Sequence, residues 1–242
     1  MANVTSNSAV LDEFVAKLKG VAGANLDSVV LYGSAAAGDY QQGYSDFNVL
    51  CLLHKLDAPA LAALRPAIAW WREQRQPNPM VFTRDELQRS ADVFAIELLD
   101  IKARHKVLAG ADHFATLNVP MDLHRVEVER ELRTNVIRLR ELYLAAGGDP
   151  KRHLALMEDS LSSFATLFRH ALIALGQPAP ESKREVFNAI AAHLGFSAGP
   201  FLAVLEARED KRKAASMDVA GTFSGFLEGV SRVADEVDRR LG

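Results

Sequence analysis

The stretch VVLYGSAAAGDYQQGYSDFNVL, residues 29–50, holds the pattern that decides the fold of the first half of this chain. Two apolar runs that contain β-branched residues, 28–32 and 46–53, lie on either side of a segment with Gly and Ala residues. Runs of this length and composition, bounded by small residues, are typical of buried strands. The first run ends at Gly33 and Ser34. We therefore predict two adjacent buried strands, with a turn and a short helix between them.

The junction at Gly33 and Ser34 has the composition of a phosphate-binding turn. A glycine lets a phosphate approach the backbone, and the Ser34 hydroxyl can donate a hydrogen bond to it. The alanines that follow favour a helix, whose N-terminus attracts anions. The structural alternative is a tight turn in which Ser34 only caps the helix. We predict that Gly33 and Ser34 hold the phosphates of a nucleotide.

Asp46 and Asn48 are two residues apart on the second predicted strand, so their side chains project from one face of it. Two carboxylates at this spacing can hold Mg²⁺, but here the second position is an amide. An Asp within an apolar run is costly to bury without a partner or a metal. Asp46 is therefore predicted to mark a site, the alternative being that it caps the entrance to the strand.

This arrangement resembles the nucleotidyltransferase superfamily, which includes DNA polymerase beta and the aminoglycoside nucleotidyltransferases. Its signature is a Gly-Ser, a short helix, and then Asp-x-Asp on the neighbouring strand. Residues 29–53 carry this resemblance in this chain, with Asp-x-Asn in place of Asp-x-Asp. Residues 94–110 look like the stretch that follows the catalytic core in members similar to streptomycin adenylyltransferase. The second half of the chain is similar to the helical domain with which such enzymes select their substrate.

The resemblance implies a set of site residues and cofactors. Gly33, Ser34 and Ser45 would bind a nucleoside triphosphate, ATP in the first place, while Asp46 and Asn48 would bind Mg²⁺. The amide of Asn48 is a neutral and weaker ligand, so its presence removes a full negative charge from the metal site. Asn48 is therefore either a weak ligand in a one-metal enzyme or the mark of lost catalysis in a protein that still binds nucleotide.

A third carboxylate, which in active relatives acts as a metal ligand or as the base for the acceptor hydroxyl, is expected near residues 77–82. No acidic residue is present there. Glu97 and Asp100 are the nearest candidates downstream, and we predict Glu97 as the catalytic carboxylate recruited in space. The alternative is that these acids are surface ion-pair partners.

The order of predicted elements defines an α/β (α+β) protein. A small mixed-sheet nucleotidyltransferase domain is expected over residues 1–118, and an all-helical bundle over residues 119–242, after the break at Val119-Pro120. In the first domain, apolar spacing predicts helices over 10–21 and 56–74 and a strand over 80–82. In the second, it predicts helices over residues 121–146, 154–175, 183–194, 200–208 and 222–241.

Local signals add detail to these elements. Thr83 and Glu86 have the spacing of a capping box for a further helix, and Asp149-Pro150 can start the helix that follows Gly147-Gly148. The charged residues of the 121–146 helix predict ion pairs within that helix. Residues 208–213 read as a solvated loop, and His105 as part of a solvated basic turn rather than a phosphate contact.

Bulk composition limits the classes of partner. The chain has 242 residues with a formal net charge of −3 and no sustained basic patch, so no nucleic-acid partner is expected. It has no apolar stretch near 18 residues, so no membrane partner is expected, and its polar N-terminus lacks the pattern of a signal peptide. The single cysteine, Cys51, lies in an apolar run and predicts a small buried side chain rather than a nucleophile. These features favour a cytoplasmic location for the protein.

Two functions follow from the sequence. In the first, a Mg²⁺-dependent nucleotidyltransferase with an incomplete carboxylate set transfers a nucleoside monophosphate to a hydroxyl of a small-molecule or protein acceptor. In the second, a catalytically silent protein of the same fold binds a nucleotide or a protein partner. Asn48 and the missing strand acid favour the second. A polymerase of nucleic acid is disfavoured by the acidic balance.

Overall fold

The computed structural model describes residues 2–36 and 46–239. The chain divides into two compact units, Met1–Pro120 and Met121–Gly242, called here unit 1 and unit 2. Unit 1 contains a mixed four-stranded sheet with helices, and unit 2 contains helices. The fold is therefore α+β, as the sequence predicts.

The sheet of unit 1 has the strand order β3-β2-β1-β4. These strands are β1 (Leu26–Tyr32), β2 (Asn48–Leu53), β3 (Met80–Thr83) and β4 (His105–Gly110). The central strand β1 is antiparallel to both β2 and β4, whereas β3 runs parallel to β2. The two apolar runs of residues 28–32 and 46–53 thus contain the neighbouring strands β1 and β2, as predicted.

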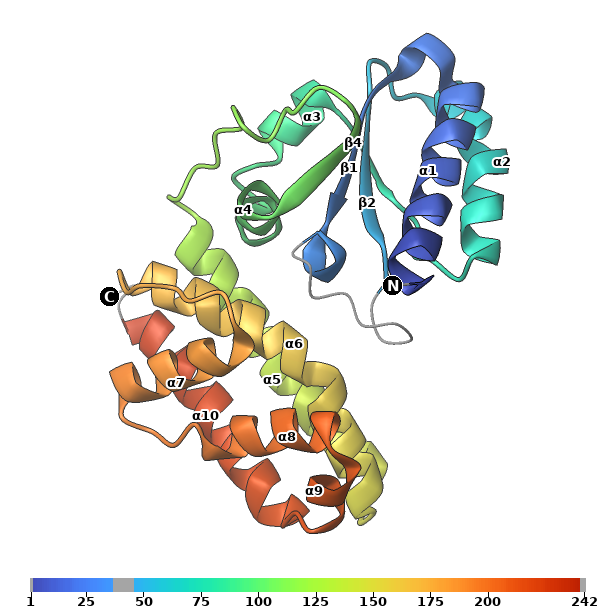
Figure 1. Cartoon of the computed structure of the whole chain (residues 1–242). Helices are drawn as coiled ribbons and strands as arrows, with labels where there is room; N and C mark the ends of the chain where they lie inside the picture. Colours follow the sequence, from blue (N-terminus) through green and yellow to red (C-terminus); the bar gives the residue numbers. More distant parts are fainter. Residues whose placement is uncertain (1, 37–45, 240–242) are drawn as a thin grey trace. The chain divides into compact units, whose positions relative to one another are not determined.

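Helices α1 (Ala2–Ala22) and α2 (Ala58–Glu73) cover one face of the sheet (Figure 1). Strand side chains alternate between the two faces, so every second residue points into this layer. Trp71 of α2 is fully buried and stacks on Phe14 of α1, with ring centroids 4.0 Å apart. The core on this face includes Val29, Leu31, Phe47, Val49, Cys51 and Leu53 from the sheet segment.

Helices α3 (Arg84–Arg89) and α4 (Ala95–Ala103) lie on the opposite face (Figure 1). The intervening strand residues, Val30, Leu50 and Leu52, form the core of this layer with Leu98 and Ile101 of α4. The capping box that starts α3 is confirmed. Thr83 accepts from the amide of Glu86, while the Glu86 carboxylate accepts from the amide of Thr83 at 2.8 Å.

The structure corrects the sequence predictions for unit 1 at two places. Strand β2 begins at Asn48, so Asp46 precedes the strand instead of lying on it. His105 is not in a solvated turn, because it is the first residue of β4 and its side chain is only 13% exposed. This edge strand includes a lysine and half-buried residues, and it therefore lacks the apolar run that identified β1 and β2.

The described part of unit 2 is helical throughout. It comprises α5 (His124–Ala146), α6 (Pro150–Ala174), α7 (Lys183–Leu194), α8 (Gly199–Glu209), α9 (Lys211–Ala215) and α10 (Val219–Arg239). Asp149 caps α6 as predicted, accepting from the amide of Lys151 at 2.9 Å. Residues 208–213, predicted as a loop, include the end of α8 and most of the short α9, which Asp210 caps.

The core of unit 2 is rich in phenylalanine. Phe201 of α8 lies 5.2 Å from Phe168 of α6 and 5.0 Å from Phe187 of α7, measured between ring centroids. The predicted ion pairs on α5 are partly between helices: Arg133 pairs with Glu129 at 3.2 Å but also with Asp235 and Asp238 of α10. Arg133 thus links α5 to α10, a contact that helical spacing cannot reveal.

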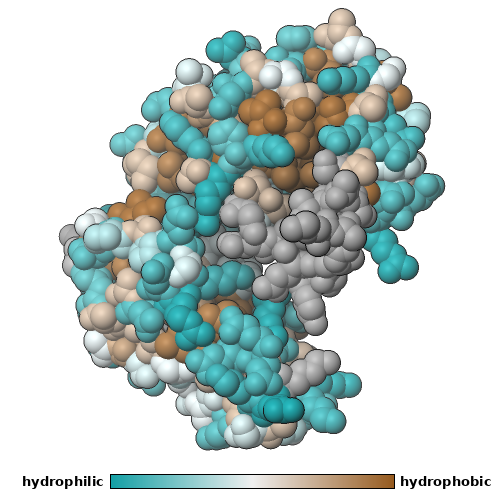
Figure 2. All heavy atoms as spheres, viewed as in Figure 1, coloured by the Kyte–Doolittle hydropathy of each residue, from teal (hydrophilic) through white to brown (hydrophobic). Residues whose placement is uncertain are grey.

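The visible surface is mostly hydrophilic, with hydrophobic residues gathered over part of unit 1 (Figure 2). Among the residues described, no helix has the length and apolar character required to cross a bilayer.

Candidate functional site

The turn after β1 has the backbone that a phosphate-binding glycine requires. Gly33 has φ 76°, a left-handed conformation that only glycine adopts without strain. A single 3₁₀ turn, Gly33–Ala35, follows, and the amide of Ala36 donates to the Gly33 carbonyl at 3.1 Å. Ser34 is exposed in this turn. The predicted pair of nucleotide-binding residues therefore stands open to solvent at the end of the central strand.

Asn48 lies directly against this turn. It pairs with Tyr32 across the antiparallel ladder of β1 and β2, one residue before Gly33. A Cβ placed on Gly33 would lie 3.0 Å from the Asn48 Nδ2 atom. The amide nitrogen is a hydrogen-bond donor, so Asn48 presents a donor group, rather than a carboxylate, to the backbone of the turn.

Asp46 is exposed and stands two residues before β2. The residue between Asp46 and Asn48 is tightly held: the Phe47 side chain is 5% exposed, and its amide donates to the Oε1 atom of Gln76 at 2.8 Å. Asp46 thus directly precedes a residue whose backbone and ring are both held. Sequence reasoning missed Gln76, because nothing marks it except its place beside the helix-stopping Pro77.

Glu97 comes to the same end of β1 from α4. Glu97 lies one helical turn before Ile101 of α4, whose carbonyl accepts from His105, the partner of Tyr32 across β1 and β4. Burial raises the pKa of the Tyr32 hydroxyl, and the negative charge of Glu97 raises it further. Tyr32 also packs with the core on the α4 face, to which the β2 residues Leu50 and Leu52 belong. Asn48 has the same alternation as Leu50 and therefore projects from the face on which Glu97 lies.

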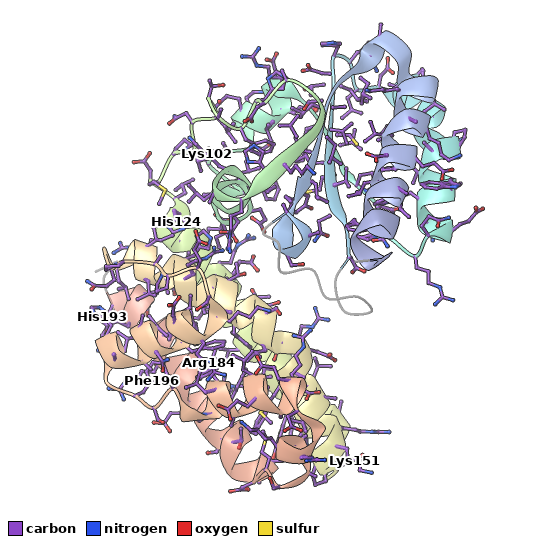
Figure 3. The ribbon with its side chains drawn as sticks, in the orientation of Figure 1. Lys102, His124, Lys151, Arg184, His193 and Phe196 are labelled. Carbon is purple, nitrogen blue, oxygen red and sulfur yellow. The ribbon has the colours of Figure 1, made fainter. Side chains whose placement is uncertain are left out.

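The helix that carries Glu97 is anchored by the segment after β4. Lys102, labelled in Figure 3, belongs to α4. Its Nζ atom donates to the carbonyl of Leu117 at 2.6 Å. His105 pairs with Tyr32 across β1 and β4, and its Nδ1 atom donates to the Ile101 carbonyl at 2.9 Å. Its Nε2 atom lies 3.1 Å from the Oδ1 atom of Asp112. Because both ring nitrogens have partners, His105 supports the site rather than binding phosphate.

Cys51 takes no part in chemistry at this site. It is fully buried in β2, and burial raises its pKa to about 12. A thiol with this pKa is protonated at neutral pH and is a poor nucleophile. The prediction of a small buried side chain is confirmed.

The residues present fit one Mg²⁺ better than two. In the described parts of the chain, no group of three or more His, Cys, Asp or Glu side chains could hold a metal. Mg²⁺ is commonly bound by one or two carboxylates, with substrate phosphates and water as the remaining ligands. Asp46, which is exposed and stands two residues before β2, is the candidate for such a carboxylate. Ser45, the other predicted nucleotide contact, lies outside the described residues.

Comparisons with known proteins give the fold. No family model and no curated protein matches the chain. Among solved structures, the chain is similar to a spectinomycin adenyltransferase, AAD(9) from Enterococcus faecialis, crystallised with ATP and spectinomycin. The similarity covers 90% of this chain and 98% of that one, with a TM-score of 0.53 and 16% sequence identity. This identity speaks for the fold alone, and the chain thus has a nucleotidyltransferase-like fold, as the stretch at residues 29–53 predicts.

Proposed function

We propose that this chain is a Mg²⁺-dependent nucleotidyltransferase that transfers AMP from ATP to a hydroxyl of a small-molecule acceptor. The observation that carries the proposal is the left-handed glycine Gly33 at the end of β1, with the amide of Asn48 against it. Glu97 of α4, whose charge raises the pKa of Tyr32, the residue before Gly33, is the candidate catalytic carboxylate. The similar adenyltransferase was crystallised with ATP and a small molecule, which supports this class of substrates.

The turn after β1 would hold the triphosphate. The backbone of Gly33 leaves room for a phosphate, and the exposed Ser34 hydroxyl can donate to its β- and γ-phosphate oxygens. Asn48 presents its Nδ2 atom to the same turn and can donate to a phosphate oxygen. Such a contact replaces part of the attraction that a second metal ion would supply in a site with two carboxylates.

Asp46 would anchor a single metal ion. Mg²⁺, when bound, neutralises charge on the triphosphate and holds it for in-line attack. Glu97 would accept the proton of the acceptor hydroxyl. The acceptor oxygen then forms a bond to the α-phosphorus, the bond from that phosphorus to the bridging oxygen of the β-phosphate breaks, and pyrophosphate leaves.

Pyrophosphate release across a panel of hydroxyl-bearing small molecules tests this reaction. We expect release that requires both an acceptor and Mg²⁺, that falls about 100-fold or more in Glu97→Gln, and that is lost in Asp46→Asn. Arg84→Gln, a change at an exposed residue of α3, serves as the matched control and should leave release unchanged. If Glu97→Gln matches the unaltered chain, Glu97 is not the base.

A second function is favoured by one specific observation. Asn48 turns an amide nitrogen toward Gly33, where two-metal chemistry needs a carboxylate. A catalytically silent protein that binds ATP without metal would have this arrangement. Calorimetric titration of ATP with and without Mg²⁺ separates the two functions. Binding that is unaffected by Mg²⁺, without pyrophosphate release for any acceptor, supports the silent protein, and a gain of activity in Asn48→Asp would identify the lost charge as the cause.

A further inference from the structure

The loop between α2 and β3 has an unusual backbone that directs one side chain toward the candidate site. Arg75 has φ 59°, and among the residues that the structure describes no other residue except glycine has a positive φ. The Trp71 indole donates to the Pro77 carbonyl at 2.8 Å, and the amide of Gln76 donates to the Trp71 carbonyl at 3.4 Å. The fully buried Trp71 thus holds the loop on both sides of Gln76.

Held in this way, the half-buried Gln76 reaches a backbone group at the start of β2. Its Oε1 atom accepts from the amide of Phe47 at 2.8 Å, and its Nε2 atom donates to the Gln74 carbonyl at 3.2 Å. The ladder between β1 and β2 begins at Asn48, so the amide of Phe47 lies just outside it. A half-buried amide without an acceptor is costly, and Gln76 supplies that acceptor.

The same loop also fixes the side chain of Phe47. Its ring lies 6.4 Å from that of Trp71, measured between centroids. Both the amide and the ring of Phe47 are therefore held by residues 71–76, and Phe47 is the residue between Asp46 and Asn48. Asp46 is exposed, and its backbone is bonded directly to the Phe47 amide group that Gln76 holds.

We propose that Gln76 is a positioning residue that sets the direction of the Asp46 carboxylate through the amide of Phe47. This inference rests on the proposed function, in which Asp46 anchors Mg²⁺. It predicts that loss of the Gln76 acceptor weakens the metal-dependent part of ATP binding. The part that depends on Gly33 and Ser34 is unchanged, because those residues lie on a different segment.

The test compares Gln76→Ala with two further variants. Gln76→Glu keeps an oxygen acceptor for the Phe47 amide. Gln88→Ala is the matched control, because Gln88 also belongs to unit 1 and its side chain also bonds to a loop backbone, donating to the Asn118 carbonyl at 2.9 Å. ATP affinity is measured by calorimetry with and without Mg²⁺, and the fold of each variant is checked by thermal unfolding.

We expect Gln76→Ala to weaken ATP binding about 10-fold in the presence of Mg²⁺ and less than about twofold in its absence. Gln76→Glu should restore most of the metal-dependent affinity, and Gln88→Ala should match the unaltered chain. The proposal is overturned if Gln76→Ala binds with unchanged affinity, or if it loses affinity equally with and without Mg²⁺, which would indicate a general structural role.

A second readout does not depend on ligand. In the nucleotide-free chain, amide hydrogen exchange of Phe47 should be slow, and should become fast in Gln76→Ala together with shifts in the ¹⁵N resonances of residues 46–48. If the unaltered chain binds no ATP but these changes occur, the proposed function fails while Gln76 still positions Asp46. If neither the exchange nor the resonances change, Gln76 is not a positioning residue.

Discussion

The turn at Gly33 depends on the absence of a side chain for two independent reasons. Its φ of 76° strains any other residue, and an added Cβ would lie 3.0 Å from the amide nitrogen of Asn48. We predict that Gly33→Ala lowers the free energy of unfolding by about 1 kcal/mol or more and weakens ATP binding, because Asn48 must move. Urea unfolding and calorimetry measure the two effects.

Gly148 provides the control for this change. It has no positive φ, and a Cβ built on it meets nothing within 4 Å among the described atoms. Gly148→Ala should leave both stability and ATP binding unchanged or raise stability slightly, since alanine restricts the unfolded chain. Equal effects of Gly33→Ala and Gly148→Ala would show that the turn has no special requirement.

Cys51 gives a pH-dependent prediction. Burial raises its pKa to about 12, so at pH 8 about one thiol in ten thousand is ionised in the folded chain. Ellman's reagent should therefore react with the unfolded chain and not with the folded one. Rapid and complete reaction of the folded chain would show that Cys51 is accessible.

The same shift affects stability at high pH. The unfolded thiol loses its proton near its ordinary value of 9.0, whereas the folded thiol keeps it up to about 12. The contribution of the buried thiol to the free energy of unfolding is therefore fully present below pH 9. Between pH 9 and 12 it declines by about 1.4 kcal/mol for each pH unit. Cys51→Val should remove that part of the slope in alkaline unfolding experiments.

At the scale of single residues, the sequence predicts what depends on local pattern. Gly33, Ser34 and Asp46 could be proposed as site residues because a glycine-serine junction and an acid beside an apolar run are visible in the chain itself. The contact of Asn48 with Gly33 requires the register of β1 and β2. Gln76 could not be found in this way, because its partner, Phe47, lies 29 residues earlier in the chain.

At the scale of elements, a stack of rings joins α5, α6 and α10. Tyr143 lies between His153 and Phe223, at 4.2 and 4.0 Å between ring centroids. His153 is 7% exposed, and its buried Nε2 atom has no hydrogen-bond partner within the described residues. An apolar ring removes this unsatisfied group, so His153→Phe should raise the free energy of unfolding by about 1 kcal/mol in urea.

His193 is an exposed histidine at the end of α7, and His193→Phe is therefore the control for this substitution. It should not stabilise the chain. If His153→Phe instead destabilises the chain by more than about 1 kcal/mol, the imidazole makes a hydrogen bond that supports the bundle.

Arg133 of α5 forms ion pairs with two acidic residues of α10. Its guanidinium lies 3.1 Å from Asp235 and 3.0 Å from Asp238, in addition to its contact with Glu129. A charge network at the surface contributes modestly and is screened by salt. Arg133→Ala should lower the free energy of unfolding by about 1 kcal/mol at low ionic strength and by less at 1 M salt.

Arg130→Ala is the matched control, because Arg130 lies on the same helix and contacts only its neighbour Glu131 among the contacts described. Arg130→Ala should lower the free energy of unfolding by less than Arg133→Ala does. A loss in Arg133→Ala that does not change with salt would point to packing of the side chain rather than to charge.

Helices and strands could be predicted where apolar residues recur at regular spacing along the sequence. Helix α7 has the predicted bounds, and β1, β2 and β3 match their apolar runs to within two residues at each end. Strand β4 was missed because it is half-buried and contains Lys106, so that its pairing with β1 rather than an apolar run marks it as a strand. Helix α9 was missed because its mixed charges are also typical of a loop.

For the whole molecule, the fold was more predictable than the reaction. A nucleotidyltransferase fold follows from a few spaced residues, and the similar adenyltransferase shares this fold with 16% identity. The acceptor cannot be predicted, because unit 2 carries no motif and its phenylalanines serve its core. The proposed role of Glu97 could not be derived from a motif, because α4 is placed on the sheet by tertiary packing through Leu98 and Ile101.

The proposed binding of the ATP triphosphate at the end of β1, with one Mg²⁺ at Asp46, can be measured by titration of ATP into the unaltered chain and Asp46→Asn, each with and without Mg²⁺. We expect one ATP for each chain, with an affinity that Mg²⁺ raises about 10-fold or more in the unaltered chain and hardly at all in Asp46→Asn. Absence of ATP binding, or an equal response to Mg²⁺ in both chains, would show that this site does not bind ATP with Mg²⁺ at Asp46.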